Sequence, residues 1–216
     1  RSRAGAFRSA VVAAVLAGVV GDSVMVAVLF ARQDSIYKAI SGCDVWDIDR
    51  DARRWPGGEP VVAHPPCRAW ASLRHCAKPR EGEKALAILA IQHVMRWGGV
   101  LEHPLLSTLW RVAGLPEPGH RDEFGGWTLI IDQHWFGHRA RKRTRLYIVG
   151  CEPSDIPTMP MVLGEATHTV GLWSGRDRAT ARPSILKHEY ESTPEAFALW
   201  LVELARRCRA ERKVSA

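Results

Sequence analysis

The feature that most constrains this chain is the segment at residues 61–70 (VVAHPPCRAW), where a short apolar run ends at two prolines and a cysteine. The apolar run is typical of a buried strand. Neither proline can extend a strand ladder, and a residue before proline is pushed toward extended backbone. The segment therefore predicts a strand that stops at Pro65 and holds the thiol of Cys67 stiffly at its carboxyl end, where open α/β sheets bind ligands. A lone cysteine is more often a small buried hydrophobic residue than a nucleophile, so the rest of the chain must supply its partners.

The composition is that of a globular chain with a basic surface. Of the 216 residues, 46% are hydrophobic and 25% are charged, which suits one domain around one core. The net charge of +7 favours a polyanionic partner, and some of the nine tryptophans would stack on bases. The five cysteines form no CxxC pair and no disulfide spacing, which indicates a reducing, cytoplasmic compartment.

Residues 1–24 have the pattern of a secretory signal, in which arginines precede an apolar run at residues 10–20. The run is too short to span a membrane, so no membrane partner is expected. We expect an N-terminal extension that is disordered or non-native. A cleaved leader is the alternative, and the odd number of cysteines argues against it.

Alternating apolar and helical segments predict an α/β fold with a mostly parallel sheet and flanking helices. Helical periodicity predicts a helix over residues 83–97 and a final helix that starts at a hydroxyl cap in residues 192–195. We divide the chain into a catalytic domain at 25–150 and a loop-rich segment at 151–216, whose final helix packs on the same domain. Strands are expected at residues 25–30, 44–49, 61–64, 100–104, 127–132 and 146–149.

Three reactive elements stand at strand ends in chain order: Cys67 after two prolines, Glu102 in Leu-Glu-His-Pro, and the basic run at residues 139–145. This order resembles the DNA cytosine-5 methyltransferases, which carry a Pro-Cys nucleophile, a Glu-Asn-Val acid and a Gln-x-Arg-x-Arg strand. The third match is the closest, because Arg143-x-Arg145-Leu-Tyr-Ile-Val-Gly follows the family pattern, with Arg141 where glutamine is usual. The acid lacks its asparagine, and the residue after the cysteine is arginine rather than glutamine.

The resemblance implies a Rossmann-like, methyltransferase-like fold and a DNA cytosine-C5 methyltransferase-like enzyme, of the reduced kind expected in a phage or prophage. Pyrimidine C5 is a poor nucleophile until a thiolate adds to C6, with an acid at the ring nitrogen and a cation at the 2-oxo group. Cys67, Glu102 and Arg145 would fill these roles around one pocket for a flipped base, with Arg143 beside them. The residues expected to contact DNA are Arg68, Arg139, Arg141 and Lys142.

The resemblance also implies S-adenosylmethionine as the cofactor, although the front of the chain departs from the family. The family carries Phe-x-Gly-x-Gly-Gly after its first strand, whereas Arg32, Asp34 and Ser35 stand where the glycines would be. The second donor element is better kept, because Asp47 would hold the ribose hydroxyls and Ile48 would cover the adenine. The expected cofactor-binding residues are Phe30, Asp34, Asp47, Ile48 and Pro65.

Other interpretations stay open. One is a pyrimidine-C5-modifying enzyme that uses a donor other than S-adenosylmethionine, and another is a catalytically inactive DNA-binding module. Glu102 alone would suit a capping or ion-paired acid, and residues 139–145 a solvated turn. Zinc binding by the set His64, Cys67, His75 and Cys76 matches no familiar spacing, so no metal is expected. We expect a monomer that acts on DNA.

Overall fold

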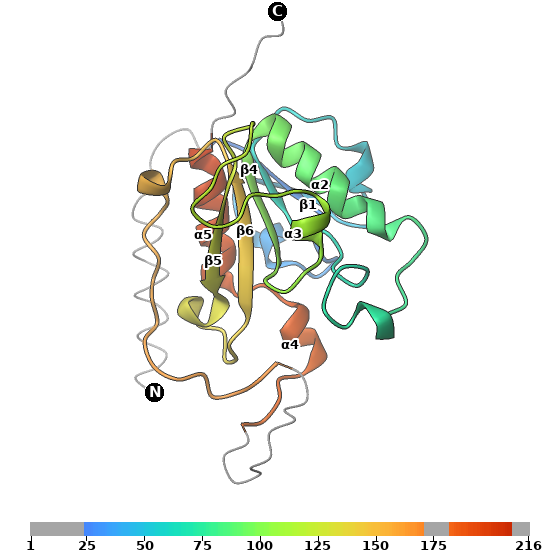
Figure 1. Ribbon diagram of the computed structural model, residues 1–216. Coiled ribbons are helices and arrows are strands. Elements are labelled where there is room, and N and C mark those ends of the chain that lie inside the picture. Colours follow the sequence, from blue (N-terminus) through green and yellow to red (C-terminus); the bar gives the residue numbers. More distant parts are fainter. Residues whose placement is uncertain (1–23, 171–181, 209–216) are drawn as a thin grey trace, which may run out of the picture.

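The computed structural model describes residues 24–170 and 182–208 of the chain (Figure 1). The predicted extension at residues 1–24 lies outside these ranges, apart from its last residue. One six-stranded sheet forms the centre, in the order β2-β1-β3-β4-β6-β5. Its strands are β1 (Val26–Leu29), β2 (Cys43–Trp46), β3 (Val61–Ala63), β4 (Gly99–Pro104), β5 (Trp127–Asp132) and β6 (Arg143–Val149). The α/β class predicted from the sequence is confirmed.

The sheet is mixed. The three pairings among β2, β1, β3 and β4 are parallel, whereas β6 runs antiparallel to both of its neighbours, β4 and β5. Three of the five pairings are therefore parallel, as expected of a mostly parallel sheet, and the two pairings of β6 depart from that expectation. The connection from β5 to β6 is short, and short connections join antiparallel neighbours, while a parallel pair needs a longer crossover.

Two long helices cover the two faces of the sheet (Figure 1). α2 (Glu83–Trp97) packs on one face and α5 (Glu195–Arg207) on the other, each against a separate buried apolar cluster. The strands between them are apolar on both sides, and β1 (VAVL) is completely buried, as expected for strands with a helix layer on each face. The other helices in the described residues are the short α3 (Leu109–Val112) and α4 (Lys187–Glu191), and the 3-10 turns η1 (Ile36–Ala39), η2 (Ala52–Arg54), η3 (Arg74–Cys76), η4 (Gln133–Phe136) and η5 (Pro153–Asp155).

The segment after β6 differs in two ways from the prediction. It contains α4, which lies at the end of the sheet where β1 to β4 terminate (Figure 1). The predicted hydroxyl cap of the final helix is wrong, because Pro194 occupies the cap position and no side chain caps the helix. The hydroxyl of Ser192 instead donates to the carbonyl of Glu189, 2.9 Å away, at the end of α4.

β3 and β4 approach each other closely at their amino ends. Gly99 has a φ of +122°, and a Cβ atom at this position would lie 2.0 Å from the carbonyl oxygen of Val61. Only glycine tolerates this approach and this backbone conformation. The pairing that carries Cys67 and Glu102 to the same end of the sheet is thereby fixed. Within the described part of the chain, no helix has the length and apolar character needed to cross a membrane.

Candidate active site at the carboxyl ends of β3 and β4

Cys67 lies just past the end of β3, as the two prolines predict. It is half-buried and starts a turn in which its carbonyl accepts the backbone N–H of Trp70 at 2.9 Å and of Ala71 at 2.8 Å. The carbonyl of Trp70 in turn accepts the N–H of Thr108 at 2.9 Å. The turn is therefore anchored to the segment that follows β4, and Cys67 is held by backbone contacts rather than by a flexible loop.

Glu102, on β4, is joined to His64 and Tyr37 by a chain of hydrogen bonds. The Nδ1 atom of His64 lies 3.1 Å from the carboxylate of Glu102, and its Nε2 atom lies 2.9 Å from the hydroxyl of Tyr37. Burial raises the pKa of Tyr37 well above its ordinary value, so its hydroxyl stays protonated. An ionised carboxylate can only accept, so the Nδ1–H group of His64 donates to Glu102.

The carboxylate of Glu102 stays ionised although it is mostly buried. Burial by itself would raise its pKa, but the hydrogen bond and the charge of His64, with a smaller contribution from Lys142, lower the pKa of Glu102 to about 2. Gln133 adds a weak contact at 3.4 Å to the second carboxylate oxygen and also donates to the hydroxyl of Thr144 at 3.0 Å. At neutral pH Glu102 is therefore a hydrogen-bond acceptor.

α4 lies at this end of the sheet, where the ring of Tyr190 and the carbonyl of Ser192 contact the amine of Lys142. The amine of Lys142 donates to the carbonyl of Ser192 at 3.3 Å and lies 5.7 Å from the ring centroid of Tyr190. α4 is itself tied down by two ion pairs, Arg139–Glu189 at 2.6 Å and Arg32–Glu191 at 2.9 Å. These contacts hold α4 at the end of the sheet where β3 and β4 terminate.

The electrostatic environment of Cys67 is divided. Burial raises the pKa of its thiol, and the negative charges of Glu102 and Glu191 raise it further, while Lys142 lowers it. Lys142 stands just before β6, and the register of β6 against β4 places Thr144 beside Pro104, so Lys142 lies at the same end of the sheet as Cys67 and Glu102. Of the three residues expected to surround one pocket, the structure brings Cys67 and Glu102 to the same end of the sheet.

Arg145 does not join them, and the expectation that its guanidinium shares their pocket is corrected here. In β6 it pairs across the strand with His103, the residue after Glu102, so the two side chains lie on the α2 side of the sheet. There the guanidinium donates to the carbonyl of Pro116 at 2.5 Å and to the hydroxyl of Thr128 at 3.2 Å, and it lies 5.0 Å above the ring of Trp110. Arg145 is a buried structural residue of the opposite face.

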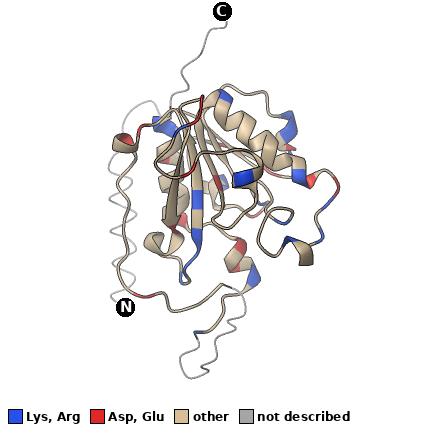
Figure 2. Ribbon diagram, viewed as in Figure 1, with Lys and Arg blue, Asp and Glu red and all other residues tan. Residues whose placement is uncertain are grey.

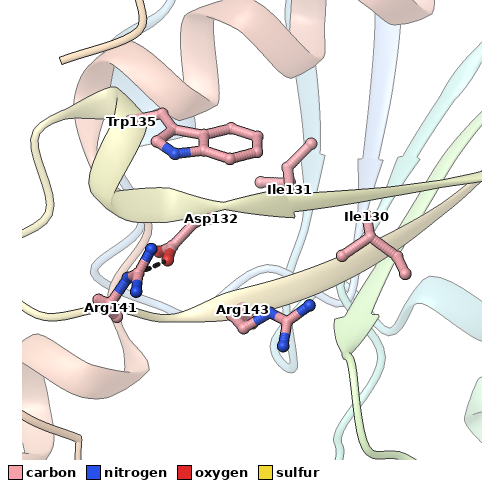
Figure 3. Close-up of a pocket in the computed structure, with 6 residues that line it drawn as sticks. All are labelled: Ile130, Ile131, Asp132, Trp135, Arg141 and Arg143. Carbon is pink, nitrogen blue, oxygen red and sulfur yellow. Dashed lines mark hydrogen bonds and ion pairs between the residues drawn. The ribbon is translucent and has the colours of Figure 1, made fainter. Parts of the chain in front are cut away.

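Arg143 also lies away from Cys67. It lines a shallow surface depression of about 260 Å³ at the outer edge of the sheet (Figure 3). This depression contains the Arg141–Asp132 ion pair of 3.2 Å, and the other residues around it are Ile130, Ile131 and Trp135. The depression is on β5, whereas Cys67 follows β3.

The basic residues expected to contact DNA are spread over the lower end of the sheet and the loop before α2 (Figure 2). Most already hold a carboxylate of the protein: Arg68 pairs with the buried Glu83 at 2.5 Å, and Arg139 and Arg141 pair as described. Among the described residues, Arg143 and Lys142 have no ion-pair partner. A phosphate would have to compete with internal acids for the paired arginines, which weakens their contribution to DNA binding.

The ends of β1 and β2 were expected to hold S-adenosylmethionine, and their residues do not form a cradle for it. Asp47 is occupied by Lys38 at 2.6 Å and by two backbone N–H groups, and the amide of Gln33 bridges to Asp49 at 2.9 Å. Asp34 is paired with Arg32 at 2.8 Å, so the loop carries side chains where a close approach would need bare backbone. Of the other expected contacts, Ile48 is 59% exposed, Phe30 is partly buried in the α2-side cluster with a φ of +61°, and Pro65 is buried.

Sequence reasoning missed four residues of the site. His64, Tyr37, Gln133 and Thr144 all belong to the network around Glu102. For His64 a signal existed, namely a polar residue between a buried strand and two prolines. Tyr37 and Gln133 lie in 3-10 turns that carry no pattern, and only the folded chain brings them to Glu102.

Comparison with protein-family models, with curated proteins and with solved structures finds no match for this chain. The five cysteines are free thiols. In residues 24–170 and 182–208, no group of three or more His, Cys, Asp and Glu side chains is arranged to hold a metal ion. The site must therefore be interpreted from its own chemistry.

Proposed function

We propose that the protein modifies a pyrimidine base of nucleic acid at C5, through covalent addition of Cys67 to C6. The resemblance to the cytosine-5 methyltransferases suggests this chemistry. The observation that carries it is the gathering of a half-buried thiol, an ionised carboxylate and a lysine at one end of the sheet, under α4. Since the ends of β1 and β2 do not fit S-adenosylmethionine, the group donor in this proposal is a different one.

Each residue of the site has a part in the proposed chemistry. Glu102 accepts a hydrogen bond from the base edge, from the 4-amino group of cytosine or from N3–H of uracil, and so orients the ring. His64 and Tyr37 hold the carboxylate in that position. The base must leave the duplex to reach Cys67, and single-stranded nucleic acid avoids that cost.

The covalent step is reversible and needs no donor. The thiolate of Cys67 forms an S–C6 bond, and the electrons of the C5=C6 bond take up an electrophile at C5. With water as the only source, that electrophile is a proton. Loss of either C5 hydrogen then breaks the S–C6 bond and restores the thiolate and the double bond. The enzyme should therefore exchange the C5 hydrogen of its target base with solvent.

This exchange tests the proposal without knowledge of the donor. Oligonucleotides labelled with tritium at C5 of cytosine or uracil, single-stranded and duplex, are incubated with the protein and the tritium released to water is counted. Wild type should release tritium, Cys67→Ser should be at least about 100-fold slower because its alkoxide is inaccessible at neutral pH, and Cys76→Ser, which changes an exposed thiol, should match wild type. If wild type and Cys67→Ser released tritium at the same rate, Cys67 would not be the nucleophile.

A second candidate function is a catalytically inactive nucleic-acid-binding module. The raised pKa of the Cys67 thiol favours it, because a protonated thiol does not attack a base. In that case the protein would bind the same oligonucleotides, measured by fluorescence anisotropy, and release no tritium from any of them.

A further inference from the structure

The positive charges around the candidate site are not equivalent. Arg139 and Arg141 each pair with an acid, and Arg145 lies on the other side of the sheet with Glu117. Lys142 differs from them, because no carboxylate of the described residues lies within ion-pair distance of its amine. Its charge is therefore available to the groups of the site.

The protein holds this amine in a defined place. The backbone N–H of Lys142 donates to Asp132 at 2.9 Å, and the backbone carbonyl of Lys142 accepts the N–H of Gln133 at 3.1 Å. These two bonds tie Lys142 to the segment that contains Gln133, which contacts Glu102. The end of the side chain is fixed by the carbonyl of Ser192 and the ring of Tyr190. Such support on both sides is not needed for a solvated surface lysine.

We propose that Lys142 is the positioning cation of the candidate active site and favours the thiolate form of Cys67. The inference rests on the proposed function in naming the cation of that same site, a place that the family resemblance would give to Arg145. Lys142 acts here through Cys67 and is not itself a nucleophile or a base.

The charged groups at this end of the sheet decide the direction of the effect on the thiol. Glu102 comes from β4, Glu191 and Tyr190 from α4, and His64 from the segment before Cys67. Both carboxylates oppose a thiolate, and Lys142 is the side chain that favours it. Without Lys142 the sulfur would face two negative charges in a half-buried place, and its pKa would rise.

Alkylation of Cys67 by iodoacetamide as a function of pH tests this inference. The full chain is used without nucleic acid, and the modified peptide is quantified by mass spectrometry so that the exposed Cys76 does not interfere. For Lys142→Gln, which keeps a donor for the Ser192 carbonyl, the midpoint of the pH profile should move up by about one unit. At pH 7 alkylation should be about threefold slower, because the higher intrinsic reactivity of a more basic thiolate offsets part of the lost thiolate fraction.

Two matched variants complete the design. Lys142→Arg keeps the charge and should restore the wild-type midpoint, while Lys187→Gln removes an 85% exposed lysine of α4 and should leave the profile unchanged. If Lys142→Gln fails to fold, as judged by circular dichroism, Lys142→Met is compared in its place. A profile of the folded neutral variant that superimposes on wild type overturns the inference. The alkylation assay contains no nucleic acid, so its outcome does not depend on the proposed reaction. If no tritium were released in the exchange assay, the proposed function would be refuted, and the measured effect of Lys142 on Cys67 would remain valid.

Discussion

The two sides of the sheet at the ends of β4 and β6 use the same residue types for opposite purposes. On the α5 side, Glu102, His64 and Lys142 are partly exposed and lie at the end of the sheet that carries the thiol of Cys67. On the α2 side, His103 and Arg145 are almost fully buried and sealed by Trp110. Glu102 and His103 are consecutive residues, so one step along the strand separates a candidate active site from a structural core.

The difference shows how strand alternation distributes a run of charges. Side chains on a strand point alternately to the two faces, so residues 143 and 145 share one side and residue 144 takes the other. The register of β4 against β6 places Arg145 beside His103. A cation at the end of the sheet that carries Cys67 comes instead from Lys142, just before the strand begins, where its amine contacts the carbonyl of Ser192 after α4. The order of basic residues in the sequence therefore does not show which of them lies at the candidate active site.

The largest expected effect is on the sealed side. Arg145→Met should lower the free energy of unfolding by about 3 kcal/mol, because it leaves the carbonyl of Pro116, the hydroxyl of Thr128 and the ring face of Trp110 without their buried partner. Urea unfolding at pH 7 measures the loss, and tritium release per folded molecule should match wild type. A stable variant that releases no tritium would place Arg145 in the site and break the contrast between the two sides.

Most of the fold follows from local sequence signals. The buried strand β1, the stop of β3 at Pro65 and the helix from Glu83 to the glycines after Trp97 were predicted because apolar runs, prolines and glycines act within a few residues. The direction of β6 and the presence of α4 were not, since they depend on partners far along the chain. α4 is only five residues long and is held by Arg139 and Arg32, which no periodicity reveals.

The sequence allowed the position of Cys67 and Glu102 to be predicted, but not the side chains around them. Both residues stand where a strand meets proline, and neighbouring parallel strands end at the same edge of a sheet. The face of the sheet on which Arg145 lies depends on the register of two strands about 40 residues apart, and local sequence signals do not set that register. The network from Tyr37 to Glu102 likewise crosses three segments of the chain.

The second prediction concerns the pH dependence of the sealed side. Burial lowers the pKa of His103 from 6.5 to about 4, so the unfolded chain binds a proton between these values and the native protein does not. The stability that neutral His103 contributes is therefore present above pH 6.5 and lost as the pH falls toward 4. Between pH 7 and pH 5 this one group should cost about 2 kcal/mol. Urea unfolding of wild type and of His103→Gln at both pH values isolates the contribution of this histidine. If the free energy of unfolding changed equally with pH in the two proteins, the prediction would be contradicted.

The smallest expected change in stability is on the open side, at Glu102. Its pKa is lowered from 4.5 to about 2, so its contribution is complete above pH 4.5 and is lost as the pH falls toward 2. Glu102→Gln should cost about 1 kcal/mol at pH 7, since the amide oxygen still accepts from His64, and its unfolding free energy should vary less with pH in the acid range. Tritium release should fall about tenfold, because an amide is a weaker acceptor for the base edge. If Glu102→Gln instead unfolds as readily as Arg145→Met and releases tritium at the wild-type rate, Glu102 is a structural residue and the contrast between the two sides of the sheet is wrong.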